Sequence, residues 1–128
     1  MRVLYTHLKD IDLAHSKLDF TSLDGANLRN ASLANASLYH VDLVDADLVF
    51  VNFSNADLTG SNLTNAKLKN ANFSNTIMDS VKVHRMDWLE FIKDDLQLKG
   101  AELLQKKYIV DSIYDKELER KLPMILKK

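Results

Sequence analysis

Large apolar side chains recur at every fifth residue of this sequence, from about Leu8 to Val83. The residue two positions before each of them is small or β-branched in nearly every unit, beginning with Thr6. None of the large positions is polar; they are Leu8, Leu13, Leu18, Leu23, Leu28, Leu33, Leu38, Leu43, Leu48, Phe53, Leu58, Leu63, Leu68, Phe73, Met78 and Val83. A fixed period of this kind is typical of stacked units that cannot bury their apolar faces alone.

A period of five fits neither a single helix nor a straight strand. In an α-helix five residues advance the chain by about 500°, so the leucines would surround the helix. In a straight strand side chains alternate with period two, so successive leucines would point to opposite faces. The conflict disappears if three extended residues are followed by a two-residue corner. The sequence therefore predicts an all-β solenoid, a right-handed quadrilateral β-helix of about four coils, with roughly 20 residues per coil at the ~4.8 Å strand spacing.

The second residue after each large position supports the predicted corners. In most units it is Gly, Asn, Asp or His, the residues that best tolerate a positive φ. Phe20 and Phe50 are exceptions to this composition.

Several triplets resemble the A(D/N)LXX motif of the pentapeptide-repeat family: Ala26-Asn27-Leu28, Ala46-Asp47-Leu48 and Ala56-Asp57-Leu58. The resemblance covers roughly residues 4–84 and is specific because the motif recurs in unbroken frame. It implies a right-handed quadrilateral β-helix, but no single function. The best understood members of the family bind DNA gyrase and protect it, apparently by resembling a rod of duplex DNA. A DNA-mimic regulator of gyrase is therefore the alternative function that the resemblance raises.

Composition places the chain among soluble globular proteins. Its 128 residues are 46% hydrophobic and carry a net charge of −1, which does not favour direct binding of nucleic acid. The sequence has no cysteine, no apolar run approaching ~18 residues, and no charged-then-apolar leader at Met1. We expect a cytoplasmic protein that neither spans nor is anchored to a membrane.

A second segment follows the repeats. After His84 the Asn, Ser and Ala-rich composition ends, and Glu appears for the first time at Glu90. We therefore expect two parts, a repeat β-helix over residues 1–84 and a mainly helical capping segment over residues 85–128.

Helical spacing is clearest at the start of the second segment. Apolar residues from Trp88 to Leu96 predict a helix that begins at Asp87, as N-cap, and ends near Leu98. Gly100 breaks the pattern, and residues 101–108 predict a second short helix. Residues 109–128 fit either a helix, which we favour, or a short hairpin, because Tyr108-Ile109-Val110 and Met124-Ile125-Leu126 also suit strands. Pro123 ends any helix there.

A stack of coils leaves an apolar disc and unpaired backbone groups at each end, so its terminal units need a cap. The side chains expected to cover the final coil are Trp88, Leu89, Phe91 and Ile92. The alternative for this stripe is an interface, so a homodimer through the C-terminal segment is a second hypothesis.

The sequence offers little for chemistry. The four histidines are His7, His15, His40 and His84; no two are 20 residues apart, so neighbouring coils would not bring them together as metal ligands. No glycine-rich phosphate loop and no nucleophile beside a base is present. We therefore expect no enzyme, no metal and no cofactor.

Two groups of surface residues stand out. Large side chains replace small polar ones at the corner positions Phe20, Tyr39, His40, Val44, Val49 and Phe50, and these indicate a protein-interaction surface unless the tail covers them. Phe20 and His40 are 20 apart and should stack beside Tyr39. The second group is a local acidic strip of Asp42, Asp45, Asp47 and Asp57.

Charge favours a scaffold over a DNA mimic. Residues 1–84 carry nine Asp, no Glu and seven Lys or Arg, a net charge of only −2. Arg29 and Lys69 are expected at one corner, where they interrupt any anionic face. The sequence thus predicts a non-catalytic, rigid scaffold or protein-interaction module whose protein partner is unknown.

Overall fold

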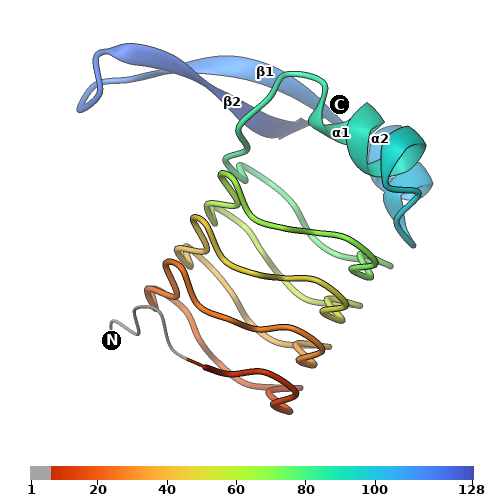
Figure 1. Ribbon diagram of the computed structural model, residues 1–128. Helices are drawn as coiled ribbons and strands as arrows, with labels where there is room; N and C mark the ends of the chain where they lie inside the picture. The colour runs from red at the N-terminus through yellow and green to blue at the C-terminus, as the bar shows by residue number, and fades with distance from the viewer. Residues whose placement is uncertain (1–6) are drawn as a thin grey trace.

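The five-residue units are wound into stacked coils. The computed structural model of the chain describes residues 7–128. Thr6, with which the small or β-branched series begins, and the first residues of the expected β-helix over residues 1–84 lie outside the described residues. Parallel bridges join His7 to Asn27 and Asn27 to Asp47, so bridged residues are 20 apart. Ladders with the same step begin at His7, Asp12, Lys17 and Ser22. The chain is therefore a β-helical solenoid, with its coils stacked along one axis (Figure 1).

In eight units the middle residue is an Asp or Asn that closes the corner after it. Oδ1 of Asp42 accepts a hydrogen bond from the backbone N–H of Val44 at 3.0 Å, and Oδ1 of Asp57 accepts one from that of Thr59 at 2.9 Å. The same bond is made by Asp12, Asn27, Asp47, Asn52, Asn62 and Asn72. Asp and Asn form such turns with the N–H two residues on. The preference of the motif for Asp or Asn at its middle position is therefore explained by this hydrogen bond.

The corner residue has a positive φ in every unit from Asp10 to Ser80. Phe20 and Phe50 follow this rule, with φ of 62° and 61°. The left-handed conformation costs a non-glycine residue about 1–2 kcal/mol. The corners at Phe20 and Phe50 thus have the same backbone conformation as the others and differ only in their large side chains.

The large positions form buried columns inside the coils. Leu38, Leu58 and Met78 lie one coil apart in a single column and are completely buried. Phe53 and Phe73 stack with ring centroids 5.3 Å apart and planes inclined by 15°. Both arrangements follow from the 20-residue step between bridged residues.

The C-terminal segment begins with short helices: α1 (Trp88–Glu90), a π-helix η1 (Phe91–Asp95) and α2 (Ala101–Lys107). The first helical stretch ends short of Leu98, because Lys99 pairs in parallel with Asn72 of the last coil. Asp87 occupies the N-cap position of α1, but its side chain makes no capping hydrogen bond. Its carboxylate instead accepts a 2.8 Å hydrogen bond from Nη2 of Arg85.

Residues 109–128 form a hairpin, so their interpretation as a helix is wrong. β1 (Tyr108–Asp115) pairs antiparallel with β2 (Arg120–Lys127), and the hairpin passes over the last coil and extends beyond it (Figure 1). The N–H of Ile125 donates to the carbonyl of Val81, and the N–H of Ser80 donates to the carbonyl of Ile125, both at 2.8 Å. A strand can satisfy the open edge of the last coil in this way and a helix cannot. The C-terminal segment is consequently a mixture of helix and hairpin, not mainly helical.

Tyr108 closes another side of the last coil with its side chain. Its hydroxyl accepts a hydrogen bond from the Met78 N–H at 3.1 Å and donates one to Oδ1 of Asp79 at 2.7 Å. Burial, followed by the bond to Asp79, raises the pKa of Tyr108 to about 12. The neutral hydroxyl thus takes the place of the backbone carbonyl that a further coil would supply.

Gly100→Ala is expected to loosen the cap. Gly100 has a φ of 87°, and a Cβ there would lie 2.5 Å from the backbone carbonyl of Phe73. The left-handed conformation alone costs alanine about 1–2 kcal/mol, and a backbone clash cannot be relieved by rotating a side chain. We expect thermal melting followed by circular dichroism to show a clearly lower Tm than for Asn70→Ala, which also places alanine at a corner with positive φ (59°) but adds no new Cβ. Equal losses in the two variants would mean that the contact with Phe73 has no part in stability.

Candidate aromatic interaction site

Three side chains form an exposed group on the rod, the aromatic corner (Phe20, Tyr39 and His40). The rings of Phe20 and His40 are stacked, with centroids 5.6 Å apart and planes inclined by 1°. Tyr39 packs edge-on against both rings, 5.6 Å from Phe20 and 4.3 Å from His40. Phe20 is 69% exposed. The 20-residue spacing therefore does bring these residues together, and they remain open to solvent.

Gly60 makes room for this stack. It occupies the same corner position as His40 one coil further on, and a Cβ there would lie 2.5 to 2.8 Å from three atoms of the imidazole ring. The His40 ring is therefore held between the Gly60 backbone on one side and the Phe20 ring on the other.

Asp19 adds a fixed negative charge next to Phe20 in the same corner. Its Oδ1 accepts hydrogen bonds from Oγ of Ser37 at 2.6 Å and from the N–H of Tyr39 at 2.9 Å. The bond from Ser37, and then that from Tyr39, lowers the pKa of the Asp19 carboxyl, which is ionised at neutral pH. A carboxylate beside exposed rings suits a cationic side chain, which is attracted both to negative charge and to the face of an aromatic ring.

The other predicted surface residues lie away from the aromatic corner. Val49 is only 6% exposed and lines a groove together with Phe91 of the cap. Val44 is half-buried and lines another groove with Pro123 of β2. Phe50, by contrast, is 55% exposed. The C-terminal segment thus lies beside the two valines, which explains their apolar side chains at corner positions. Phe50 remains a separate exposed ring.

The repeats match a known family. The family model for pentapeptide repeats fits residues 6–43 and 46–83, with eight copies, which together make up more than half of the chain. The chain belongs to the pentapeptide-repeat family.

Solved structures of other pentapeptide-repeat proteins resemble this chain in part. HetL, involved in heterocyst differentiation regulation in the cyanobacterium Nostoc sp. strain PCC 7120, is 22% identical over 64% of this chain, with a TM-score of 0.34. This chain spans only 40% of the length of HetL. A pentapeptide-repeat protein from the Arabidopsis thaliana thylakoid lumen is 24% identical, with coverages of 68% and 74% and a TM-score of 0.30. One from the cyanobacterium Cyanothece 51142 is 17% identical, with coverages of 66% and 88% and a TM-score of 0.35.

These likenesses are too distant to carry an argument about function. No curated protein sequence matches the chain. Family membership therefore rests on the repeats themselves.

The four predicted acidic residues are spread around this pentapeptide-repeat rod. Asp42, Asp47 and Asp57 belong to three different bridge ladders, and each accepts the N–H of its own corner. Asp47 also pairs with Arg29, with 3.5 Å between Oδ2 and Nη1, and Asp45 is an exposed corner residue. Over residues 7–128, no three His, Cys, Asp or Glu side chains are grouped so that they could hold a metal ion.

The four aromatic and aliphatic residues at the start of the cap pack against the repeat. Trp88, Leu89 and Ile92 are buried in the same core as the coils, whereas Phe91 is half-buried. Trp88 contacts Phe73 edge-on, with ring centroids 6.0 Å apart and planes inclined by 78°. Because three of these side chains are occupied within one chain, an interface between copies would have to use other residues of the cap.

Sequence reasoning missed two residues that shape these sites. Gly60 has a signal in the sequence, because it follows His40 by 20 residues in the same corner column. Tyr108 has none, because it lies beyond the repeat and its distance from Asp79 depends on how the cap folds back. In the part of the chain that the structure describes, no helix has the length and apolar character needed to cross a membrane.

Proposed function

We propose that this chain is a non-catalytic protein-interaction module, in which a right-handed quadrilateral β-helix of about four coils is the rigid support and the aromatic corner is the contact surface. The observation that carries the proposal is the exposed stack of Phe20 on His40, fixed by Tyr39 on one side and Gly60 behind it.

Prior ordering of the rings favours binding. Immobilising a free side chain at an interface costs about 0.5–1.5 kcal/mol, and rings that are already stacked avoid much of this cost. Aromatic residues are enriched among the side chains that dominate binding energy. We infer that the partner is a protein segment that presents an Arg or Lys side chain to the Phe20 ring and the Asp19 carboxylate.

The charges of the rod give no support to duplex mimicry. A mimic of DNA needs a continuous anionic face, yet Arg29 pairs with Asp47, and Lys67 follows Asp47 in the same ladder. We therefore propose an interaction surface and not a gyrase-binding rod.

Site-specific photocrosslinking tests the proposal. A benzophenone-bearing amino acid is placed at Tyr39 in one variant and at Phe50 in a control variant, since both are exposed aromatic positions at corners. After irradiation in lysate of the native cells, we expect a discrete protein adduct from position 39 and little or none from position 50. The adduct should disappear when Phe20→Ser is added, because this change removes the ring but keeps the corner.

Two results would contradict this surface. One is equal labelling from positions 39 and 50, and the other is an adduct that persists unchanged in the Phe20→Ser background. A melting curve of each variant shows that the rod is still folded.

A further inference from the structure

β2 lies between two hydrogen-bonding partners. On one side it pairs with β1, with Ser112 opposite Pro123 and Val110 opposite Ile125. On the other side it joins the last coil, where Lys82 forms an antiparallel bridge with Met124. The hairpin therefore extends a sheet that starts on the rod, and β1 is the outermost strand of that sheet.

The direction of the bonds from β2 determines which groups of β1 are free. The carbonyl of Pro123 accepts the Val83 N–H at 3.2 Å, and both backbone groups of Ile125 bond to the last coil. The backbone groups of Pro123 and Ile125 therefore point away from β1. In an antiparallel pair the residue opposite then points its own N–H and C=O outward as well, so those of Val110 and Ser112 point away from β2. The alternation gives Tyr114 the same outward direction.

These outward groups form an open strand edge. Within residues 7–128, the N–H groups of Val110 and Tyr114 have no acceptor outside the hairpin itself. The N–H of Ser112 is bonded only to the neighbouring Asp111 carboxylate, at 2.7 Å. An unpaired strand edge is a template for pairing with another chain unless it is protected. Here the Asp111 carboxylate occupies the Ser112 N–H, and the residues around α1 lie beside the start of β1.

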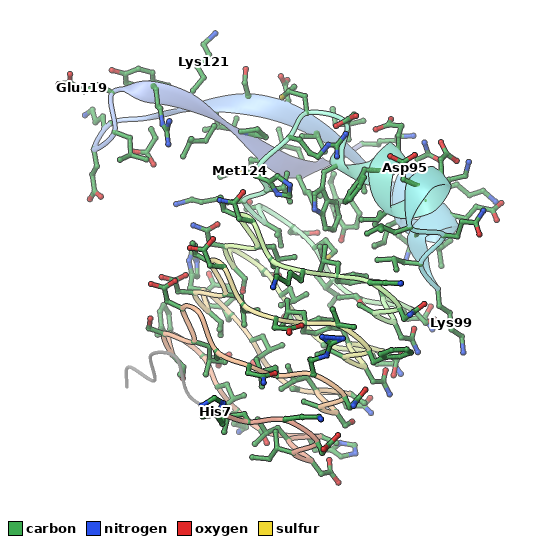
Figure 2. The ribbon with its side chains drawn as sticks, viewed as in Figure 1. His7, Asp95, Lys99, Glu119, Lys121 and Met124 are labelled. Atoms are coloured by element: carbon green, nitrogen blue, oxygen red, sulfur yellow. The ribbon has the colours of Figure 1, made fainter. Side chains whose placement is uncertain are left out.

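The outer part of the edge is accessible and partly apolar, whereas Val110 at its inner end is half-buried and lines a pocket with Met86 and Leu89. The hairpin projects beyond the coils, and its far end, marked by Glu119 and Lys121, lies clear of the rod (Figure 2). Tyr114 is 59% exposed, and Ile109 and Ile113 are also exposed. A two-stranded hairpin is marginally stable by itself, so further strands or a covering partner would stabilise this projecting half.

We propose that β1 pairs antiparallel with β1 of a second copy of this chain, about a twofold axis at Ser112, to form a four-stranded sheet. In this register Ser112 faces the second copy's Ser112, and Val110 faces the second copy's Tyr114. On the opposite side of the sheet Asp111 faces Ile113. An isologous pairing of this kind is the commonest arrangement of homo-oligomers.

The register is self-complementary. An aliphatic residue facing an aromatic one is a favourable cross-strand pair, and no two like charges face each other directly. β1 ends at Asp115, and the turn after it carries Lys116, Glu117 and Glu119, so this end of the hairpin is acidic on balance. The twofold axis places it near the end of α2 in the second copy. That end carries Lys106 and Lys107, so acidic and basic groups meet at both ends of the paired strands.

Single cysteines test the pairing in the full chain, which has no cysteine of its own. Paired residues of antiparallel strands have Cα atoms about 5.5 Å apart, so Ser112→Cys should crosslink to its copy with a short bismaleimide. Ile109→Cys is the control on the same strand, since the two copies of residue 109 would be six residues, or about 20 Å, out of register. We expect at least about tenfold more covalent dimer from Ser112→Cys than from Ile109→Cys. A mixture of Val110→Cys and Tyr114→Cys should also crosslink, whereas each alone should not.

Sedimentation equilibrium gives an independent measurement. Ser112→Pro removes an N–H that points away from β2, so it should weaken the dimer and leave the hairpin intact. Asp111→Ala frees the same N–H and should strengthen the dimer. Equal crosslinking at positions 109 and 112, or a wild-type chain that stays monomeric at all concentrations together with an unchanged Asp111→Ala variant, would overturn the proposal. These outcomes do not depend on the aromatic corner, which lies on the coils.

Discussion

Leu38→Asp is expected to unfold the coils around it. Leu38 is completely buried in a column with Leu58 and Met78, where neither water nor a cationic partner can reach a carboxylate. A buried charge without a partner falls among the changes that cost more than about 4 kcal/mol. Since whole domains are stable by only about 5–15 kcal/mol, one such charge removes much of the stability of the rod. Urea titration followed by circular dichroism should show a far lower midpoint, or no folded baseline.

Asn35→Asp is the matched control for this charge. Asn35 is an exposed corner residue of the same coil with a φ of 59°, a conformation that aspartate also tolerates. The control should melt close to the wild type. If Leu38→Asp were as stable as Asn35→Asp, the inward direction of the whole column would be wrong.

Phe53→Ala should have the second largest effect, a loss of about 3–5 kcal/mol in the free energy of unfolding. The Phe53 ring is completely buried and stacked on Phe73, and Phe73 in turn meets Trp88 of the cap. Neighbouring coils are fixed at the strand spacing, so the core has little room to collapse into the space left by the ring. Phe53→Leu should cost much less, because leucine fills the equivalent positions of other columns.

A double-mutant cycle measures the contact itself. Stacked aromatic pairs contribute about 0.5–1.5 kcal/mol beyond the area that they bury, so Phe53→Ala and Phe73→Ala should be less costly together than the sum of the two. Denaturant midpoints of the four proteins give the coupling. Strictly additive losses would contradict a stabilising interaction between the two rings.

The repeat region could be predicted from sequence because one residue pattern determines both side-chain direction and backbone geometry. The period of five placed Phe53 below Phe73 and Phe20 below His40, and both pairs are stacked in the structure. The sequence did not indicate why the motif prefers Asp or Asn, because the bond to the corner N–H appears only when the corner is built.

The cap could not be predicted to the same depth because its structure depends on the coil beneath it. Tyr108-Ile109-Val110 suits a strand or a helix, and the choice is made by the unpaired edge of the last coil, which bonds to Ile125. For the same reason the sequence could not show that Val49 would line a groove with Phe91, since that contact requires the path of the whole cap.

The attachment of the cap restricts how this protein can change in length. Lys99 is bridged to Asn72 on one side of the last coil, and Ile125 bonds to Val81 on another. Insertion of a single five-residue unit below the cap would rotate it by a quarter turn relative to the aromatic corner, whereas insertion of four units would restore the orientation. Rods of this design can therefore keep the angle between their two ends only by gaining or losing whole coils.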